Sequence, residues 1–331
     1  MTSARRLAPP RRLHLIVVLA ALATVLAACG SSPTLRRSSE ICSEPRLLPA
    51  GTSSHSFTSF GSEHRYELYV PPGYDGRRRL PVMMTFHGLG GDPATFLATT
   101  RMKKLAAQQN FIVVTPRGTG EPSRWDFRGT RADSRTDAEI VHDLVSEVRR
   151  AGCTDPSRFY ASGFSNGAVL ALTLACDPRH EFAAVGAVSG AWYPRRQCAA
   201  AGPTRVVYIH GTADRIAPFR GGSTLIGVLP PVRQMLADWA SHDACTASAT
   251  DRLTANVQRT EWSGCEVGGA LTTYVIRGGG HAWPGGDASV RATDQRFLRA
   301  RGHMSQELDA TKVIWDFVSR TSRYTADVSR Q

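Results

Sequence analysis

Residues 158–167 read Arg-Phe-Tyr-Ala-Ser-Gly-Phe-Ser-Asn-Gly, and this stretch decides the fold. Its first five residues predict a strand, and the apolar residues 168–175 predict the helix that follows. Ser165 lies in the turn between them, with Gly163 and Gly167 at the two positions where a sharp turn leaves room only for small residues. A strand, a tight turn with a serine and then a helix together predict a reactive serine at the carboxyl end of a buried strand.

Strands and helices alternate along most of the chain around this serine. The expected strands are residues 66–70, 82–86, 111–114, 158–162, 183–188, 205–209 and 271–276, and the expected helices are residues 93–109, 137–150, 168–175 and 305–317. Residues 66–70 alternate as an early antiparallel strand does, whereas residues 82–86 are continuously apolar, as in a buried parallel strand. The alternation predicts an α/β fold, a mostly parallel sheet with helices on both faces and a ligand site at the carboxyl ends of the strands.

A serine hydroxyl needs a base to activate it, and the base needs an acid to orient it. Asp214 follows the expected strand 205–209 in the segment His-Gly-Thr-Ala-Asp. His281 follows the expected strand 271–276 in a glycine-rich loop. Both positions lie at the carboxyl ends of strands, and the chain order serine, aspartate, histidine is the one this kind of fold uses. We therefore expect Ser165, Asp214 and His281 to be the catalytic residues.

Simpler interpretations exist for the two partners of the serine. Asp214 is able to cap the turn after its strand, as aspartate often does, and His281 is able to lie on a surface loop without a catalytic role. His87 and His210 are rival bases. Each directly precedes a glycine at a strand end, so we expect them to pack or to form hydrogen bonds beneath the loops.

The segment His87-Gly88-Leu89-Gly90-Gly91 follows the expected strand 82–86. An oxyanion hole needs backbone N–H groups that point at the developing negative charge. The usual pair is the residue after the nucleophile, here Asn166, and one residue of this earlier loop. We expect Leu89 to supply the second N–H group, with Gly88 as its nearest rival. A phosphate-binding loop is the competing interpretation, but the Gly-Lys-Ser/Thr that it requires does not follow.

The first 28 residues predict an export signal. Four arginines precede an uncharged, mostly apolar run at residues 13–28, which is shorter than the ~20 residues that span a bilayer. Small residues end the run directly before Cys29, an arrangement that resembles a bacterial lipobox, whose cysteine is acylated. We expect a signal peptide at 1–28, a lipidated tether at 29–54 and a single catalytic domain at 55–331, exported and anchored on the outer face of the cell membrane. An ordinary signal peptide with a chance cysteine is the alternative, and the Sec and twin-arginine routes both stay open.

The charge of the chain limits the classes of partner that we expect it to bind. The formal net charge is +12, and removal of the four signal-peptide arginines leaves +8. The arginines are scattered except for a run at residues 77–79 in an expected loop, and no nucleic-acid motif accompanies them. We expect a solvated basic surface near an anionic membrane, and no nucleic-acid partner.

Six cysteines remain once Cys29 is assigned to lipid, and an even number in an exported chain favours disulfides. Pairing of sequence neighbours suggests Cys176–Cys198 and Cys245–Cys265, which leaves Cys42–Cys153, although six cysteines allow fifteen connectivities. None of them has the CxxC or Cys/His spacing of a structural zinc site, so we expect no metal. No motif predicts a cofactor.

Four motifs together resemble those of secreted polyhydroxybutyrate depolymerases and of feruloyl or acetylxylan esterases: residues 87–91, 163–167, 210–214 and 279–285. With the lipobox, the chain is similar to the actinobacterial lipoprotein esterases of that group. The resemblance runs from about residue 66 to residue 318 and implies the α/β-hydrolase fold. Two departures are Ala168, where the family commonly has a second glycine, and Asp137-Ala138, where it commonly has paired aspartates.

The resemblance also implies a substrate class, namely hydroxyacid polyesters or acyl and hydroxycinnamoyl esters of polysaccharides. Trp283 and Trp125, together with Trp192, are candidates to contact the acyl group, although tryptophan is more often a core residue. The leading hypothesis is ester hydrolysis through an acyl-enzyme. The alternatives are acyl transfer to a sugar acceptor and a lipoprotein that binds its ligand without catalysis.

Overall fold

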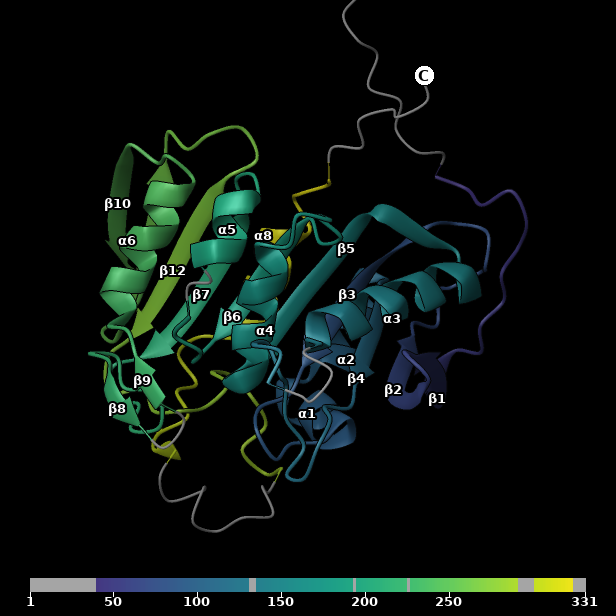
Figure 1. The fold of residues 1–331 in the computed structure, drawn as a ribbon, viewed down its shortest axis with the longest axis horizontal. Helices are drawn as coiled ribbons and strands as arrows, with labels where there is room; N and C mark the ends of the chain where they lie inside the picture. Colours follow the sequence, from purple (N-terminus) through teal and green to yellow (C-terminus); the bar gives the residue numbers. More distant parts are fainter. Residues whose placement is uncertain (1–39, 131–134, 193–194, 225–226, 291–300, 324–331) are drawn as a thin grey trace, which may run out of the picture. The chain divides into compact units, whose positions relative to one another are not determined.

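Ten strands form one mixed sheet in the computed structural model, which describes residues 40–130, 135–192, 195–224, 227–290 and 301–323 (Figure 1). In chain order the strands are β1 (Gly51–Ser59), β2 (Ser62–Val70), β3 (Leu80–Phe86), β4 (Ile112–Pro116), β5 (Thr154–Phe164), β6 (Ala184–Val188), β7 (Arg205–Gly211), β10 (Ala247–Arg252), β11 (Val257–Ser263) and β12 (Ala270–Ile276). Their order across the sheet is β1-β2-β4-β3-β5-β6-β7-β12-β11-β10. A separate two-stranded sheet pairs β8 (Gly222–Thr224) with β9 (Gly227–Leu229).

The centre of the sheet is parallel and its two margins are antiparallel. The six central strands run parallel to one another, in the order β4, β3, β5, β6, β7 and β12. The marginal strands β1 and β2 on one side, and β10 and β11 on the other, pair antiparallel with each other and with the adjacent central strand. Every residue of β3, β4 and β6 is buried, as the apolar runs predict. The carboxyl ends of the central strands therefore meet at one edge, where the sequence places its candidate site.

Helices cover both faces of the sheet (Figure 1). They are α1 (Pro93–Thr100), α2 (Met102–Gln109), α3 (Asp137–Ala151), α4 (Asn166–Ala175), α5 (Arg195–Ala200), α6 (Val232–His242) and α8 (Ala310–Val318). Successive residues of a strand point to opposite faces: Val82 and Met84 pack with α3, α4 and α6, whereas Met83 packs with α1, α2 and α8. The predicted α/β fold with both faces covered is confirmed. None of the helices that the structure describes is long and apolar enough to cross a bilayer.

Several boundaries differ from the sequence prediction, and three of them change how the chain is divided. The helix expected at 93–109 is two helices, because Arg101 between them takes a left-handed conformation (φ 54°). The closing helix begins at Ala310, where the Asp309 side chain accepts a hydrogen bond from the Lys312 N–H, and not at Ser305. The expected limit between tether and domain at residue 54 falls inside β1, which begins at Gly51 and pairs with β2. The expected signal peptide and Cys29 lie outside the described residues.

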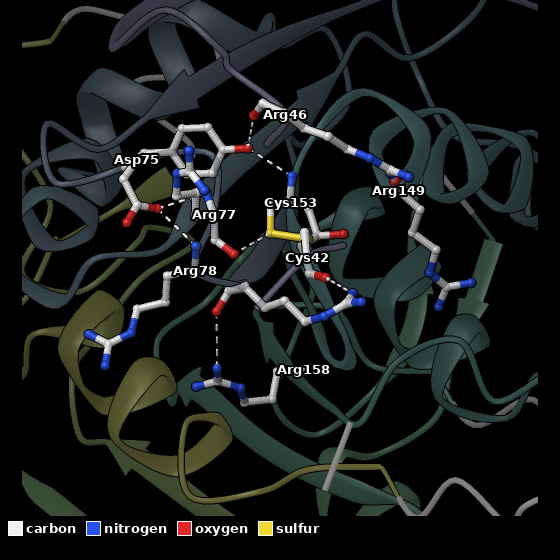
Figure 2. Close-up of a disulfide and its surroundings, with 11 residues drawn as sticks. Cys42, Arg46, Asp75, Arg77, Arg78, Arg149, Cys153 and Arg158 are labelled. Carbon is white, nitrogen blue, oxygen red and sulfur yellow. Dashed lines mark hydrogen bonds between the residues drawn. A yellow bond between two sulfur atoms is a disulfide. The ribbon is translucent and has the colours of Figure 1, made fainter. Parts of the chain in front are cut away.

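Three disulfides link the described part of the chain, and they join the cysteines that neighbour pairing suggested. They are Cys42–Cys153 (Figure 2), Cys176–Cys198 and Cys245–Cys265. Disulfides of this kind are typical of proteins that fold outside the cytosol. The first joins the segment before β1 to Cys153, between α3 and β5, across 111 positions of sequence, whereas the third spans 20.

Removal of the long-range disulfide should cost more stability than removal of a short-range one. In the chain-entropy model, loops of these lengths are worth about 5 and about 3 kcal/mol respectively. We expect the double variant Cys42→Ser/Cys153→Ser to have a free energy of unfolding lower than that of Cys245→Ser/Cys265→Ser by about 1–2 kcal/mol. Urea unfolding followed by tryptophan fluorescence measures both, and equal losses would contradict the expectation.

Candidate active site

Ser165 lies in the turn between β5 and α4, with a positive φ that non-glycine residues rarely adopt (φ 54°, ψ −119°). The turn brings backbone segments so close that side chains are excluded on both sides of the serine. A Cβ atom on Gly163 would lie 2.1 Å from the carbonyl oxygen of Gly167, and one on Gly167 would lie 2.2 Å from that of Phe86. The glycines at both offsets are therefore required by packing, and the turn holds the serine at the carboxyl edge of the sheet.

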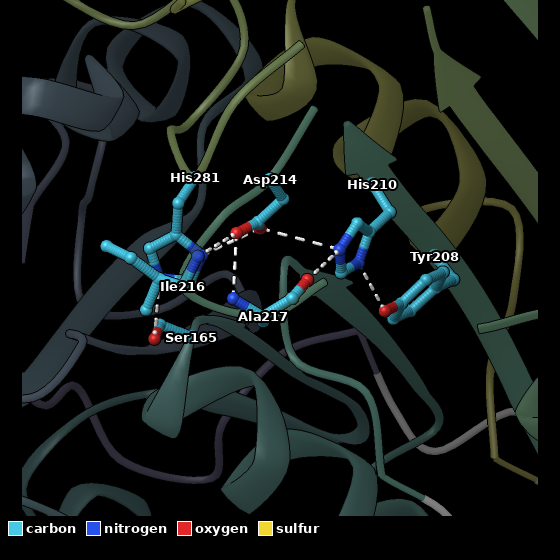
Figure 3. A network of polar contacts seen from close by, with 7 residues as sticks. All are labelled: Ser165, Tyr208, His210, Asp214, Ile216, Ala217 and His281. Atoms are coloured by element: carbon cyan, nitrogen blue, oxygen red, sulfur yellow. Dashed lines mark hydrogen bonds and ion pairs between the residues drawn. The ribbon is translucent and has the colours of Figure 1, made fainter. Parts of the chain in front are cut away.

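The structure brings Ser165, His281 and Asp214 together in one line of hydrogen bonds (Figure 3). The Nε2 atom of His281 lies 2.8 Å from Ser165 Oγ, and its Nδ1 atom lies 2.8 Å from Asp214 Oδ2. The serine comes from the end of β5, the aspartate from the loop after β7 and the histidine from the loop after β12. With the Nδ1 proton of His281 held in the hydrogen bond to Asp214, Nε2 is free to accept the serine proton.

The Asp214 carboxylate is buried and surrounded by donors. Its Oδ1 atom accepts hydrogen bonds from the backbone N–H groups of Ile216 (2.9 Å) and Ala217 (2.8 Å). Burial alone would raise the pKa of this carboxyl, but the hydrogen bond from His281 and the charges of His281 and His210 outweigh it, so that the pKa lies below its ordinary value. The carboxylate therefore stays ionised beside the imidazole that it orients.

Trp125 connects the serine turn to the loop that carries Leu89. The Asn166 side chain accepts a hydrogen bond from the Trp125 N–H (2.7 Å) and donates one to the Trp125 carbonyl (3.1 Å). The Trp125 indole N–H in turn donates to the His87 carbonyl (2.7 Å). Sequence analysis missed this link, because nothing in the pattern of residues 117–130 shows that they turn back onto the serine.

The two N–H groups expected to form the oxyanion hole are open. No described residue accepts a hydrogen bond from the backbone N–H of Leu89 or of Asn166. The loop that holds Leu89 is fixed from below by His87, whose Nδ1 lies 2.7 Å from the Gly88 carbonyl and whose Nε2 accepts from the Gly118 N–H at 3.0 Å. Burial lowers the pKa of His87, which fits a neutral structural histidine rather than a rival base.

A family model described as "Putative esterase" matches residues 58–263, more than half of the chain. The chain belongs to this esterase family. The expected enzyme class is thereby confirmed, and the protein is a carboxylic ester hydrolase.

Relatives of this esterase fit the same class. A protein of Nocardia uniformis subsp. tsuyamanensis named "Putative esterase NocK" is 27% identical, over 77% of this chain and 82% of that protein. Feruloyl esterase B of Piromyces equi is 24% identical over 64% of this chain, a match that spans only 41% of that protein. The solved acetyl xylan esterase from Aspergillus awamori has a TM-score of 0.53 at 17% identity, covering 75% of this chain and 98% of that one. The α/β-hydrolase fold and the resemblance to feruloyl and acetylxylan esterases are confirmed, whereas the lipoprotein type stays a prediction.

His210 is a second imidazole beside Asp214 in the esterase. Its Nε2 lies 2.8 Å from the Ala217 carbonyl and 3.4 Å from Asp214 Oδ2, while Nδ1 lies 2.6 Å from the Tyr208 hydroxyl (Figure 3). Burial lowers the pKa of His210 to about 4. The neutral ring therefore donates through Nε2 and accepts the tyrosine proton at Nδ1. It lies beneath the loop, as expected from sequence, but its contact with the aspartate was not foreseen.

The two tryptophans expected to contact substrate lie in the interior of the esterase. Trp283 is 2% exposed, packs edge-on against Phe96 and donates its indole N–H to Thr311 Oγ1 (2.9 Å). Trp125 is 4% exposed and donates its indole N–H to the His87 carbonyl. Their polar and apolar atoms are already engaged by the protein, and this placement argues against direct contact with the acyl group.

The buried His210 should make the stability of the esterase depend on pH. Its pKa is near 6.5 in the unfolded chain and about 4 in the folded one, so between these values only the unfolded chain binds the proton. The contribution of the neutral His210 to the free energy of unfolding is complete above pH 6.5. It is lost as the pH falls to 4, which lowers the free energy of unfolding by up to about 3 kcal/mol. We expect His210→Gln to flatten this part of the profile in urea unfolding between pH 4 and 7. An unchanged slope in His210→Gln would contradict the assignment.

Proposed function

We propose that the esterase hydrolyses carboxylic esters through an acyl-enzyme on Ser165. The observation that carries the proposal is the unbroken line of hydrogen bonds from Ser165 Oγ through His281 to Asp214, at 2.8 Å each. A nucleophile, a base and an orienting carboxylate at these distances are the arrangement that activates a serine hydroxyl. The serine mechanism and the residues that perform it are part of this proposal.

The reaction follows from the geometry in two halves. Ser165 Oγ attacks the ester carbonyl carbon while His281 Nε2 takes its proton, and the N–H groups of Leu89 and Asn166 stabilise the oxyanion. The tetrahedral intermediate collapses, and the alcohol leaves with the proton from His281. Water then attacks the acyl-enzyme, gives a proton to His281 and releases the acid, after which the proton returns to Ser165. Asp214 stays ionised throughout and stabilises the imidazolium.

For the substrate we propose acyl or hydroxycinnamoyl esters of polysaccharides, or hydroxyacid polyesters. The names of the relatives, feruloyl esterase and acetyl xylan esterase, support the polysaccharide esters, and the polyesters rest on the sequence resemblance alone. An aromatic pair close to the serine turn supports an aromatic acyl group. Phe127 and Trp192 are both partly exposed, with ring centroids 5.2 Å apart. Trp192 follows Gly190, which packs against the Ser165 carbonyl. Its indole N–H, unlike those of Trp125 and Trp283, has no hydrogen-bond partner among the described residues.

We further propose that the esterase acts outside the cell from a lipid anchor on Cys29. The support is the apolar run that ends in small residues directly before this cysteine and the three disulfides of the folded part. The folded catalytic unit would then follow a short tether that ends before Cys42, since this cysteine is already bonded to Cys153.

Replacement of Ser165 tests the mechanism. We expect Ser165→Ala in the full-length protein to lower kcat on a nitrophenyl ester by at least about 10⁴-fold, because no other group can form the acyl-enzyme. A fluorophosphonate probe should label the wild type but not the variant. Ser146→Ala, an exposed serine on α3, should match the wild type in both assays. Unchanged turnover in Ser165→Ala would refute the proposal.

Replacement of Trp192 tests the aromatic acyl group. Loss of a partly exposed ring that stacks on the substrate costs roughly 1 kcal/mol or more, so Trp192→Ala should raise KM for a methyl ferulate about fivefold or more and change KM for an acetyl ester less than about twofold. Trp262→Ala, a partly buried tryptophan on β11, is the matched control. An equal effect on both esters would assign Trp192 to general packing.

A further inference from the structure

A pocket lies beside the Cys42–Cys153 disulfide, at the end of the sheet remote from Ser165. Figure 2 shows the disulfide with Arg46 and Arg149 near it. Its volume is about 120 Å³, close to that of four water molecules at ~30 Å³ each. Its wall combines the segment 42–46, Arg79 directly before β3, and residues 149–156, where α3 ends and β5 begins. Ser165 follows the other end of β5, an eleven-residue strand, roughly 35 Å away at ~3.3 Å per residue. The pocket is therefore separate from the ester site.

Three arginines line this pocket, one from each segment of its wall: Arg46, Arg79 and Arg149. Arg46 Nη1 donates to the Arg149 carbonyl (2.5 Å), and Arg79 Nη1 donates to the Thr154 carbonyl (3.1 Å). These hydrogen bonds to neutral carbonyls hold two of the guanidinium groups in the wall without neutralising their charge. Neither Arg46 nor Arg79 forms an ion pair with a carboxylate of the described residues.

One of the three arginines is already paired with a carboxylate, because Glu181 Oε2 lies 2.7 Å from Arg149 Nη2. The Asp155 carboxylate is engaged outside the set, since its Oδ2 lies 2.6 Å from Arg158 Nε. The uncompensated charges of the pocket are therefore those of Arg46 and Arg79. In addition, the Nε atoms of Arg79 and Arg149 are buried and have no hydrogen-bond partner among the described residues. Buried donors without partners are costly and call for an explanation. An anion in the pocket would supply the missing charge and acceptors.

We propose that this pocket binds a phosphate group. Guanidinium groups form paired hydrogen bonds with both carboxylate and phosphate, but here they come from three separate segments of the chain. A tetrahedral phosphate offers oxygens to donors on several sides, whereas a planar carboxylate offers only two oxygens in one plane. The Cys42–Cys153 disulfide fixes the geometry, because it ties the segment of Arg46 to the end of α3 that carries Arg149.

The phosphate group has two plausible sources, a free phosphate ion and the headgroup of an anionic phospholipid. Cys42 lies thirteen positions after Cys29, a stretch of chain that reaches at most about 47 Å at ~3.6 Å per residue. With the anchor proposed above, the pocket would stay within reach of the membrane surface. Phosphate binding itself does not depend on the ester chemistry or on the anchor.

Calorimetric titration of the full-length protein with inorganic phosphate, in an uncharged detergent at constant ionic strength, tests the pocket. We expect saturable binding to the wild type and at least about tenfold weaker binding to Arg46→Gln and Arg79→Gln, because each loses a charge-assisted contact. Arg78→Gln removes the same charge from an exposed neighbour outside the pocket and should bind as the wild type does. Nitrophenyl ester turnover should stay unchanged in all three variants, which shows that they are folded.

Three further titrations distinguish the two sources of the phosphate group. Soluble dihexanoyl phosphatidylglycerol that binds the wild type and not Arg79→Gln identifies a lipid headgroup, and phosphate that binds where this lipid does not identifies the free ion. Acetate at the same concentration should not compete. Binding that is equal in Arg46→Gln, Arg79→Gln and Arg78→Gln, equal affinity for acetate, or no saturable binding of either phosphate source would overturn the proposal.

Discussion

The site of this esterase depends on one buried contact, the hydrogen bond from His281 Nδ1 to Asp214 Oδ2. Both side chains are closed to solvent, so water can neither replace the bond nor screen the charge that it shares. The contact also fixes which nitrogen faces Ser165, since the proton on Nδ1 leaves Nε2 as the acceptor. Its geometry requires that the ends of β5, β7 and β12 meet at one edge, which only the parallel centre of the sheet provides.

Burial of the Asp214 carboxylate has a cost that the loop after β7 offsets. An ionised carboxylate in the interior needs donors, and the chain supplies two backbone N–H groups within three residues of the aspartate itself. His210 closes the remaining side as a neutral ring, because burial lowers its pKa to about 4. The Tyr208 hydroxyl donates a hydrogen bond to Nδ1 of that ring. The orientation of His281, the base in the proposed mechanism, therefore depends on side chains outside the line of hydrogen bonds that ends at Ser165.

The sequence predicts those elements of the molecule in which the local residue pattern agrees with the packing. The serine turn was predictable because no residue larger than glycine fits at Gly163 or Gly167. Strands β3 and β4 were predictable because their residues are buried throughout. Strand β10 was not expected, since its residues are exposed and polar, and the break at Arg101 depends on one backbone angle. The Asn166–Trp125 link and the Asp214–His210 contact depend on how distant loops fold back, which periodicity does not encode. The three pocket arginines are separated by 33 and 70 positions for the same reason.

Strand β5 relates the two ends of the esterase to each other. Ser165 follows its carboxyl end and the arginine-lined pocket surrounds its amino end, so a ligand in the pocket and an ester at the serine lie on opposite edges of the sheet. If the pocket holds a lipid headgroup, the edge that carries Ser165 faces away from the bilayer. That orientation would suit a substrate too large to enter the membrane, such as a polysaccharide or a polyester particle, and would suit poorly an ester dissolved in the bilayer. The rigid parallel strand, more than the tether, would then decide which esters the anchored enzyme meets.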